Sequence, residues 1–136
     1  MEGIDDGQDQ WLRAFMPLYE QAAPLIQDIT KLDDSGLPAD PETLVEAIEK
    51  LPPILESVRN LPKPKQKEFR NIKKDFENVL IRCIKAGETE VKLLDDLNHG
   101  AQMAARMRLA TIVGYTGQAI VYYELLSKRL ASLSGE

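Results

Sequence analysis

The chain has 136 residues, a net charge of −5 and a single cysteine. This length fits one domain of the commonest size, and an apolar fraction of 43% is too high for general disorder. The lone Cys83 excludes an internal disulfide, so the fold does not depend on an oxidising compartment.

The N-terminal part begins with an acidic stretch. Residues 1–8 lack the basic and apolar regions of a secretory signal peptide, so we expect a flexible N-terminus on a cytoplasmic protein. From residue 9 to residue 32, apolar residues recur at spacings of four and three, which is typical of a helix with one buried seam. This seam consists of Trp11, Phe15, Leu18, Ala22, Leu25, Ile29 and Leu32. Pro17 and Pro24 lie off the seam. Either the helix restarts near Pro17, or one helix bends around a core with its prolines outward, and we predict the bent helix.

The next segment has clear helix signals. Residues 33–40 form a loop by composition, and Asp40–Glu42 then carries the residue types that favour a helix start. The seam consists of Leu44, Ile48, Leu51, Leu55 and Val58. Pro52–Pro53 again lies off the seam, where a bend is expected. The helix should end near Leu61, because Pro62 disfavours helix in the residue before it.

The second half of the chain predicts two long helices. The third helix begins near Lys65, and its seam consists of Phe69, Ile72, Phe76, Val79, Cys83 and Ala86. Gly87 is a candidate for a bend or a break. A further apolar series of Val91, Leu94 and Leu97 continues to Asn98, and His99–Gly100 then reads as a helix stop. The last helix spans residues 101–133, and no segment alternates with the period of a strand.

These segments predict an all-α fold, an antiparallel up-and-down bundle of four main helices. It forms a single domain over residues 9–133, followed by a frayed tail at 134–136. The last helix is unusual because it is apolar around its circumference from Leu109 to Leu126. Its longest uncharged run, residues 109–123, is shorter than the roughly 20 residues of a membrane span, so no membrane is expected. Such a helix is either central or covered by a second subunit.

Catalytic and metal-binding motifs do not occur in recognisable form. His99 is the only histidine, which is too few for histidine-rich metal bundles. A single histidine at an expected turn also weakens any scheme in which histidine activates a nucleophile. The acidic clusters 88–90 and 95–96 would need inward-facing partners on another helix to hold a metal ion. We therefore expect no metal, no cofactor and no catalytic residue, and Cys83 on the seam predicts a buried, inert thiol. An enzyme with converging carboxylates is the weakest function hypothesis.

A basic segment spans Arg59–Lys74, with seven basic residues against one acidic residue and a net charge of +6. The candidate anion-binding residues are Lys63, Lys65, Lys67, Arg70, Lys73 and Lys74. They predict contact with nucleic-acid phosphates, a phosphorylated ligand or an acidic protein. The negative chain as a whole argues against a dedicated nucleic-acid binder. A solvated corner, or a match with the acidic first fifty residues of another subunit, is the alternative.

The last helix carries small residues among aromatic ones. Candidate interface residues are Ala110, Gly114, Tyr115, Gly117 and Tyr122. A glycine inside a helix costs about 1 kcal/mol relative to alanine, so two of them indicate close packing. That packing is either within one bundle or between two subunits. The leading hypothesis is a non-enzymatic helical interaction module that self-associates as a homodimer through this helix. The alternative is a nucleic-acid or phospholigand-binding subunit that uses residues 59–74.

Overall fold

The computed structural model describes residues 6–30 and 41–133. Over these ranges the chain forms α1 (Asp6–Thr30), α2 (Pro41–Arg59), α3 (Lys67–Asn98) and α4 (Gln102–Leu133), and no strand. The predicted all-α class with four helices is confirmed. The expectations for residues 1–5, for the loop at 33–40 with the helix start at Asp40, and for the tail at 134–136 lie outside the described residues.

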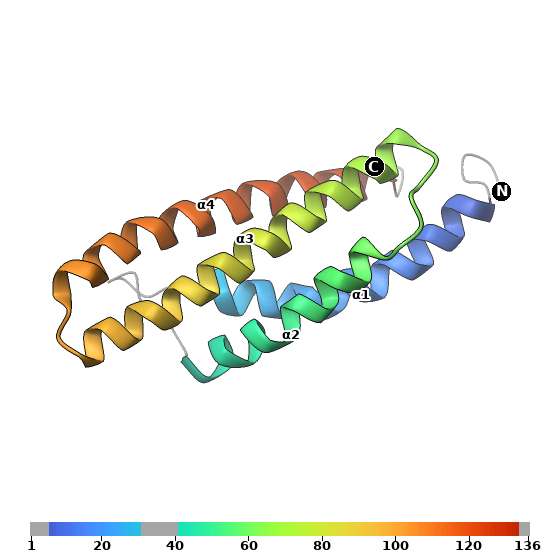
Figure 1. Ribbon diagram of the computed structural model, residues 1–136. Coiled ribbons are helices and arrows are strands. Elements are labelled where there is room, and N and C mark those ends of the chain that lie inside the picture. Colours follow the sequence, from blue (N-terminus) through green and yellow to red (C-terminus); the bar gives the residue numbers. More distant parts are fainter. Residues whose placement is uncertain (1–5, 31–40, 134–136) are drawn as a thin grey trace.

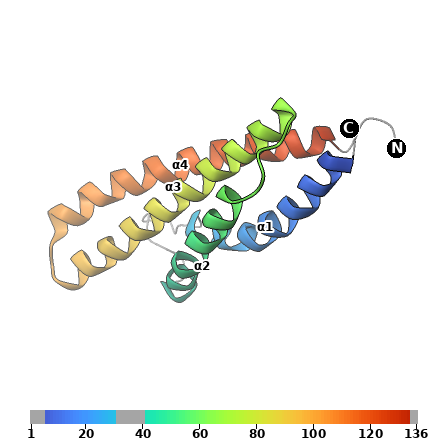
Figure 2. The same cartoon turned by 45° about the vertical axis from the view of Figure 1, so that its right-hand side comes forward.

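The longest feature of the fold is the hairpin of α3 and α4, which are joined at residues 99–101 (Figure 1). Residues near the start of α3 contact residues near the end of α4: Arg129 Nε donates to Asp75 Oδ2 at 2.9 Å. Close to the turn, the guanidinium of Arg108 binds the carboxylate of Asp96. α1 and α2 pack beside the half of α3 that is distant from the turn, and the turn end of the hairpin extends beyond them in both views (Figure 1, Figure 2).

The prolines within α1 and α2 lie on exposed faces. Pro17 and Pro24 are inside one continuous α1, and Pro52–Pro53 is inside one continuous α2. All four are exposed. Each proline leaves one carbonyl of the preceding turn without its helical partner, and an outward position lets water take the place of the lost donor. This explains how both helices continue through residues that usually end a helix.

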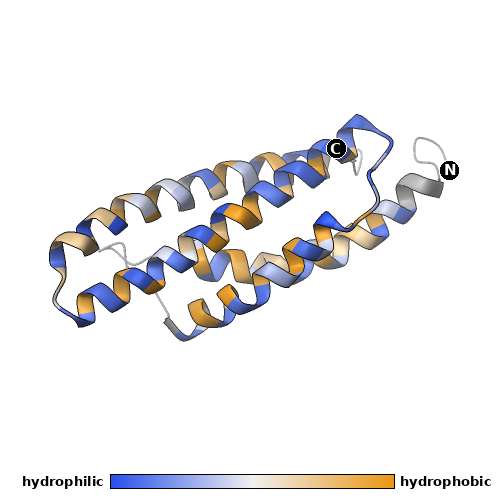
Figure 3. Ribbon diagram, viewed as in Figure 1, coloured by the Kyte–Doolittle hydropathy of each residue, from blue (hydrophilic) through white to orange (hydrophobic). Residues whose placement is uncertain are grey.

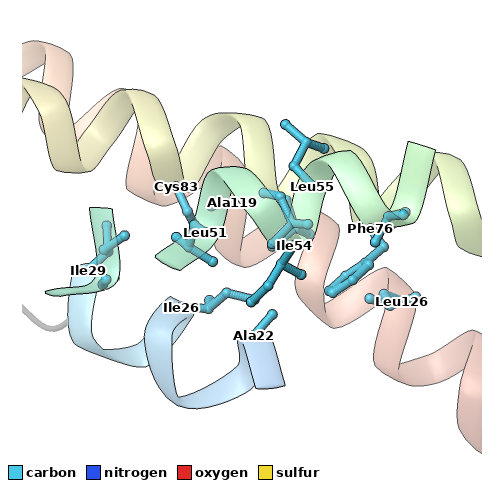
Figure 4. Close-up of a cluster of buried hydrophobic side chains, with 14 of the residues drawn as sticks. Ala22, Ile26, Ile29, Leu51, Ile54, Leu55, Phe76, Cys83, Ala119 and Leu126 are labelled. Carbon is cyan, nitrogen blue, oxygen red and sulfur yellow. The ribbon is translucent and has the colours of Figure 1, made fainter. Parts of the chain in front are cut away.

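The main core lies between α1, α2 and α3 and includes two residues of α4, Ala119 and Leu126 (Figure 4). Its largest fully buried side chains include Phe15, Phe69 and Phe76. The ring centroids of Phe15 and Phe76 are 5.2 Å apart in an edge-to-face arrangement, a geometry that aromatic pairs favour. α3 contributes seam residues along most of this core, so α3 is the central helix of the fold.

α3 runs through Gly87 without a break, so the break that was one expectation for this residue does not occur. Gly87 is buried, and a Cβ added there would lie 2.8 Å from Ile48 Cγ1 and 3.5 Å from Ile29 Cδ1. The glycine therefore lets α1 and α2 approach the backbone of α3 closely. The helix continues because packing on both neighbours offsets the propensity cost of roughly 1 kcal/mol.

α4 is peripheral, so a central position for this helix is also excluded. It packs along α3 and has few contacts with α1. One of these contacts joins the hydroxyls of Tyr19 and Tyr123, which are 3.2 Å apart. Its buried residues form one narrow stripe of Ala105, Ile112, Thr116, Ala119 and Leu126, while apolar residues also occur elsewhere along the helix (Figure 3). Within the described ranges, no helix has the length and apolar character that a membrane crossing requires.

Candidate functional site

The outward side of α4 carries a stripe of uncharged, exposed residues, which we call the outer stripe. It consists of Met103, Met107, Ala110, Gly114, Gly117, Val121 and Leu125. Met103 is 79% exposed, Met107 is 70% exposed and Val121 is 57% exposed. From Met103 to Val121 the spacings alternate between four and three, as in a helix–helix seam, and Leu125 follows four residues later. At 1.5 Å per residue the stripe is about 33 Å long. Large apolar side chains gathered on one exposed face are a common feature of interaction surfaces, so the outer stripe is a candidate site.

The middle of the outer stripe is hollow. A Cβ added at Gly114 or at Gly117 would meet nothing within 4 Å. A groove of about 450 Å³ lies over this point, lined by Gly114, Gly117, Gln118, Val121, Tyr122 and Leu125. These two glycines thus fill no packing role against any described part of the chain. Their backbone is therefore exposed on the outward side of α4.

One flank of the outer stripe is bounded by two opposite charges. Val113 and Ile120 extend the apolar surface on this flank, with Arg106 before them and Glu124 after them. At 100° per residue, Arg106 and Glu124 both lie about 60° from the centre of the stripe, on the same side. Both are exposed, and neither forms an ion pair within the described ranges. The two charges lie nearly equally far from the central glycines.

The interface residues expected from the sequence are divided between two sides of α4. Ala110, Gly114 and Gly117 lie together on the outer stripe. Tyr115 and Tyr122 are half-buried and pack against the main core, although Tyr122 also forms one edge of the groove. The exposed methionines and the two flanking charges were missed, because apolar residues on the buried side of α4 obscure the seven-residue repeat of the exposed side.

The basic segment forms a second concave site, which we call the basic pocket. A cavity of about 350 Å³ between the end of α2 and the start of α3 is lined by Arg59, Leu61, Lys63, Pro64, Arg70, Lys73, Lys74 and Glu77. Four of the six candidate anion-binding residues therefore come together, and Arg59 joins them. Lys65 and Lys67 are exposed outside this cavity.

The loop that carries the basic pocket is held by contacts at both ends. Trp11 Nε1 donates to the carbonyl oxygen of Pro62 at 3.0 Å, and Pro64 is buried. On the other side, Arg70 Nη1 donates to the carbonyl oxygens of Pro64 and Lys65. Lys73 Nζ binds Glu77 Oε2 at 2.7 Å within the wall of the cavity. Contacts within the chain therefore fix the shape of this loop.

A buried carboxyl group interrupts the core of the hairpin. Glu90 is fully buried, and neither of its carboxylate oxygens has a hydrogen-bond partner. Burial raises the pKa of Glu90 from 4.5 to about 8, so the group is mostly neutral at pH 7. It separates the main core from a smaller cluster of Leu93, Ala105 and Ile112. The seam spacing that ends at Ala86 continues to positions 90 and 93, so the sequence did contain this signal.

α3 continues to Asn98, as the second apolar series predicted. Within this series Leu94 packs against the main core, whereas Val91 and Leu97 are 41% and 42% exposed. Cys83 is fully buried, and burial together with the charge of Glu90 raises the pKa of its thiol to about 12. The predicted burial of Cys83 is confirmed. The described residues include no cluster of three or more histidine, cysteine or carboxylate side chains suited to a metal ion.

Comparison with known protein families finds no family model that matches the chain, and comparisons with curated proteins and with solved structures find no match either.

Proposed function

We propose that this protein is a non-enzymatic helical interaction module that forms a homodimer through the outer stripe of α4. One observation carries the proposal: an exposed apolar stripe with helix–helix spacing runs along a helix that packs against the rest of the fold on only one side. Burying such a stripe removes apolar surface from water, at about 25 cal/mol for each Å².

A second copy of α4 fits this surface better than an unrelated partner, because the surface is complementary to itself. In an antiparallel pair centred between Gly114 and Gly117, each glycine meets the other glycine of the second copy, and the two backbones approach closely. Ala110 then lies opposite Val121 of the second copy. A two-fold axis makes such a contact closed, which is the commonest symmetry among soluble homo-oligomers.

The flanking charges support the same arrangement. With this centre, Arg106 lies beside Glu124 of the second copy, and the two-fold axis generates the same pair again at the other end. Both charges lie on the same flank of the stripe, as a two-fold axis requires. Exposed ion pairs contribute only about 0–1 kcal/mol each, so they set the register and direction of the pair while the apolar stripe provides the affinity.

A charge exchange tests the dimer. Sedimentation velocity or light scattering should show a dimer for the unchanged chain and weaker dimers for Arg106→Glu and for Glu124→Arg, because each single change places like charges together. The double variant Arg106→Glu/Glu124→Arg should recover the dimer, since it restores two opposite pairs. A matched control is Lys92→Glu, an exposed charge reversal on α3 that should leave the dimer unchanged.

A monomeric unchanged chain at high concentration would overturn the proposal. A dimer that none of these charge changes weakens would show that the outer stripe pairs in another register or that another face associates. We also propose that neighbouring helices run in alternating directions and that α1 and α2 bend at their four prolines. We propose a cytoplasmic location for the protein.

A further inference from the structure

The basic pocket lies at the opposite end of α3 from the hairpin turn, so its use is independent of self-association through the middle of α4. Five cationic side chains line it, and Glu77 is the only acidic one. The pocket thus has a net charge of +4 in a chain whose net charge is −5. We propose that this pocket is a binding site for a small ligand that carries one or two phosphate groups.

The available donors fit phosphate chemistry. Within the described ranges, Arg59, Lys63 and Lys74 form no ion pair, so their charges are available to a ligand. Arg70 uses Nη1 for the loop carbonyls, which fixes the guanidinium plane while its remaining N–H groups stay available. Charge-assisted hydrogen bonds from such groups to phosphate oxygens are about twice as strong as neutral ones.

Contacts within the chain fix the loop of the pocket before a ligand binds. Trp11 holds the carbonyl of Pro62 from one side, and Arg70 holds the carbonyl of Pro64 from the other side. A fixed loop loses little conformational freedom when a ligand binds, which favours affinity for a small molecule. The first two turns of α3 also lie in the pocket wall, and the positive end of their helix dipole favours an anion there.

The distribution of charge favours a small ligand over a nucleic acid. Arg59, Lys63, Arg70, Lys73 and Lys74 surround one cavity of about 350 Å³, whereas a nucleic-acid backbone needs cations spread along a track. The two lysines that could begin such a track, Lys65 and Lys67, stand outside the cavity. The acidic chain as a whole would also repel a long polyanion.

The test uses inorganic pyrophosphate as the probe, at low ionic strength, with the full chain. Trp11 is the only tryptophan and hydrogen-bonds the pocket loop, so its fluorescence reports binding. Calorimetry provides a second readout. The informative variant is Lys63→Ala/Lys74→Ala, and its matched control is Lys65→Ala/Lys67→Ala. Both variants remove two exposed charges from the same segment, but only the first removes them from the pocket.

We expect saturable binding of one pyrophosphate per chain, weakened about tenfold or more by Lys63→Ala/Lys74→Ala, which removes two charged hydrogen bonds. The control should weaken binding by roughly threefold or less, through the loss of long-range attraction alone. Absence of saturation overturns the proposal, and so does equal weakening by the two variants. A single-stranded oligonucleotide that binds more tightly than pyrophosphate also overturns it, in favour of a nucleic-acid track.

Discussion

Gly87 of α3 and Ile48 of α2 pack directly against each other: a Cβ on residue 87 would lie 2.8 Å from Ile48 Cγ1. Ile48 cannot turn aside easily, because a β-branched side chain is stiff at χ1 and Ile29 lies on the other side of the same position at 3.5 Å. Gly117 of α4 provides the opposite case, since its added Cβ would meet nothing within 4 Å.

Gly87→Ala should therefore destabilise the fold by about 1–2 kcal/mol, because overpacking outweighs the gain in helix propensity. Gly117→Ala should stabilise it by about 0.5–1 kcal/mol, because only the propensity gain remains. Urea unfolding measures both, in an Arg106→Glu background that keeps the contribution of association small. Equal effects of the two substitutions would contradict a close helix approach at Gly87.

Glu90 predicts an unusual dependence of stability on pH. Its pKa in the folded chain is about 8 instead of 4.5, so the folded chain binds more protons than the unfolded chain between these two values. Stability should therefore fall as the pH rises through this window, by roughly 1.4 kcal/mol per pH unit from this group, and level off above it.

Glu90→Leu should remove this slope. Its free energy of unfolding should exceed that of the unchanged chain by an amount that grows with pH through the same window, measured by urea unfolding at a series of pH values. Glu88→Gln is the control, because Glu88 is exposed on the same turn of α3. A pH profile of Glu90→Leu that parallels the unchanged chain would mean that residue 90 ionises normally in the folded state.

The thiol of Cys83 should be protected as long as the chain is folded. It is fully buried, and the pKa of about 12 leaves almost no thiolate at neutral pH. A thiol reagent at pH 8 should label the native chain no faster than the chain opens, and should label one thiol per chain at once in denaturant. Rapid labelling of the native chain would show that the α3–α4 contact near Cys83 opens easily.

Periodicity predicted most of the fold, because the core residues of α1, α2 and the first half of α3 repeat at helical spacing. Periodicity failed at positions on the buried seam where the residue type is not one that normally packs in a core. Glu90 lies on the seam of α3 and is buried, although a carboxylate is a residue type expected at the surface. The neighbouring Val91 is apolar, yet it is exposed. Glycine is a residue type that often interrupts helices. At position 87 it is instead needed because Ile48 of α2, which is far away in sequence, packs against it.

The candidate sites were predicted less completely, for a physical reason. α4 has apolar residues on two sides, and only the packed structure distinguishes the side that faces α3 from the side that faces outward. The basic segment was visible as a run of charges. Which of its lysines converge depends on the loop contacts of Trp11 and Arg70, and sequence spacing does not reveal those contacts.

Glu77 offers the sharpest test of how the basic pocket works. It is the only acidic residue in the pocket wall and binds Lys73 Nζ at 2.7 Å. Glu77→Gln would raise the net charge of the pocket by one and free Lys73 for a ligand, so pyrophosphate should bind more tightly, by roughly three- to tenfold. Stability should change by no more than about 1 kcal/mol, since partly exposed i,i+4 pairs contribute little. Glu88→Gln, which removes one negative charge far from the pocket, is the matched control for calorimetric titration. Tighter binding in both variants would mean that only the overall charge matters, whereas tighter binding in Glu77→Gln alone requires the phosphate to lie beside Lys73.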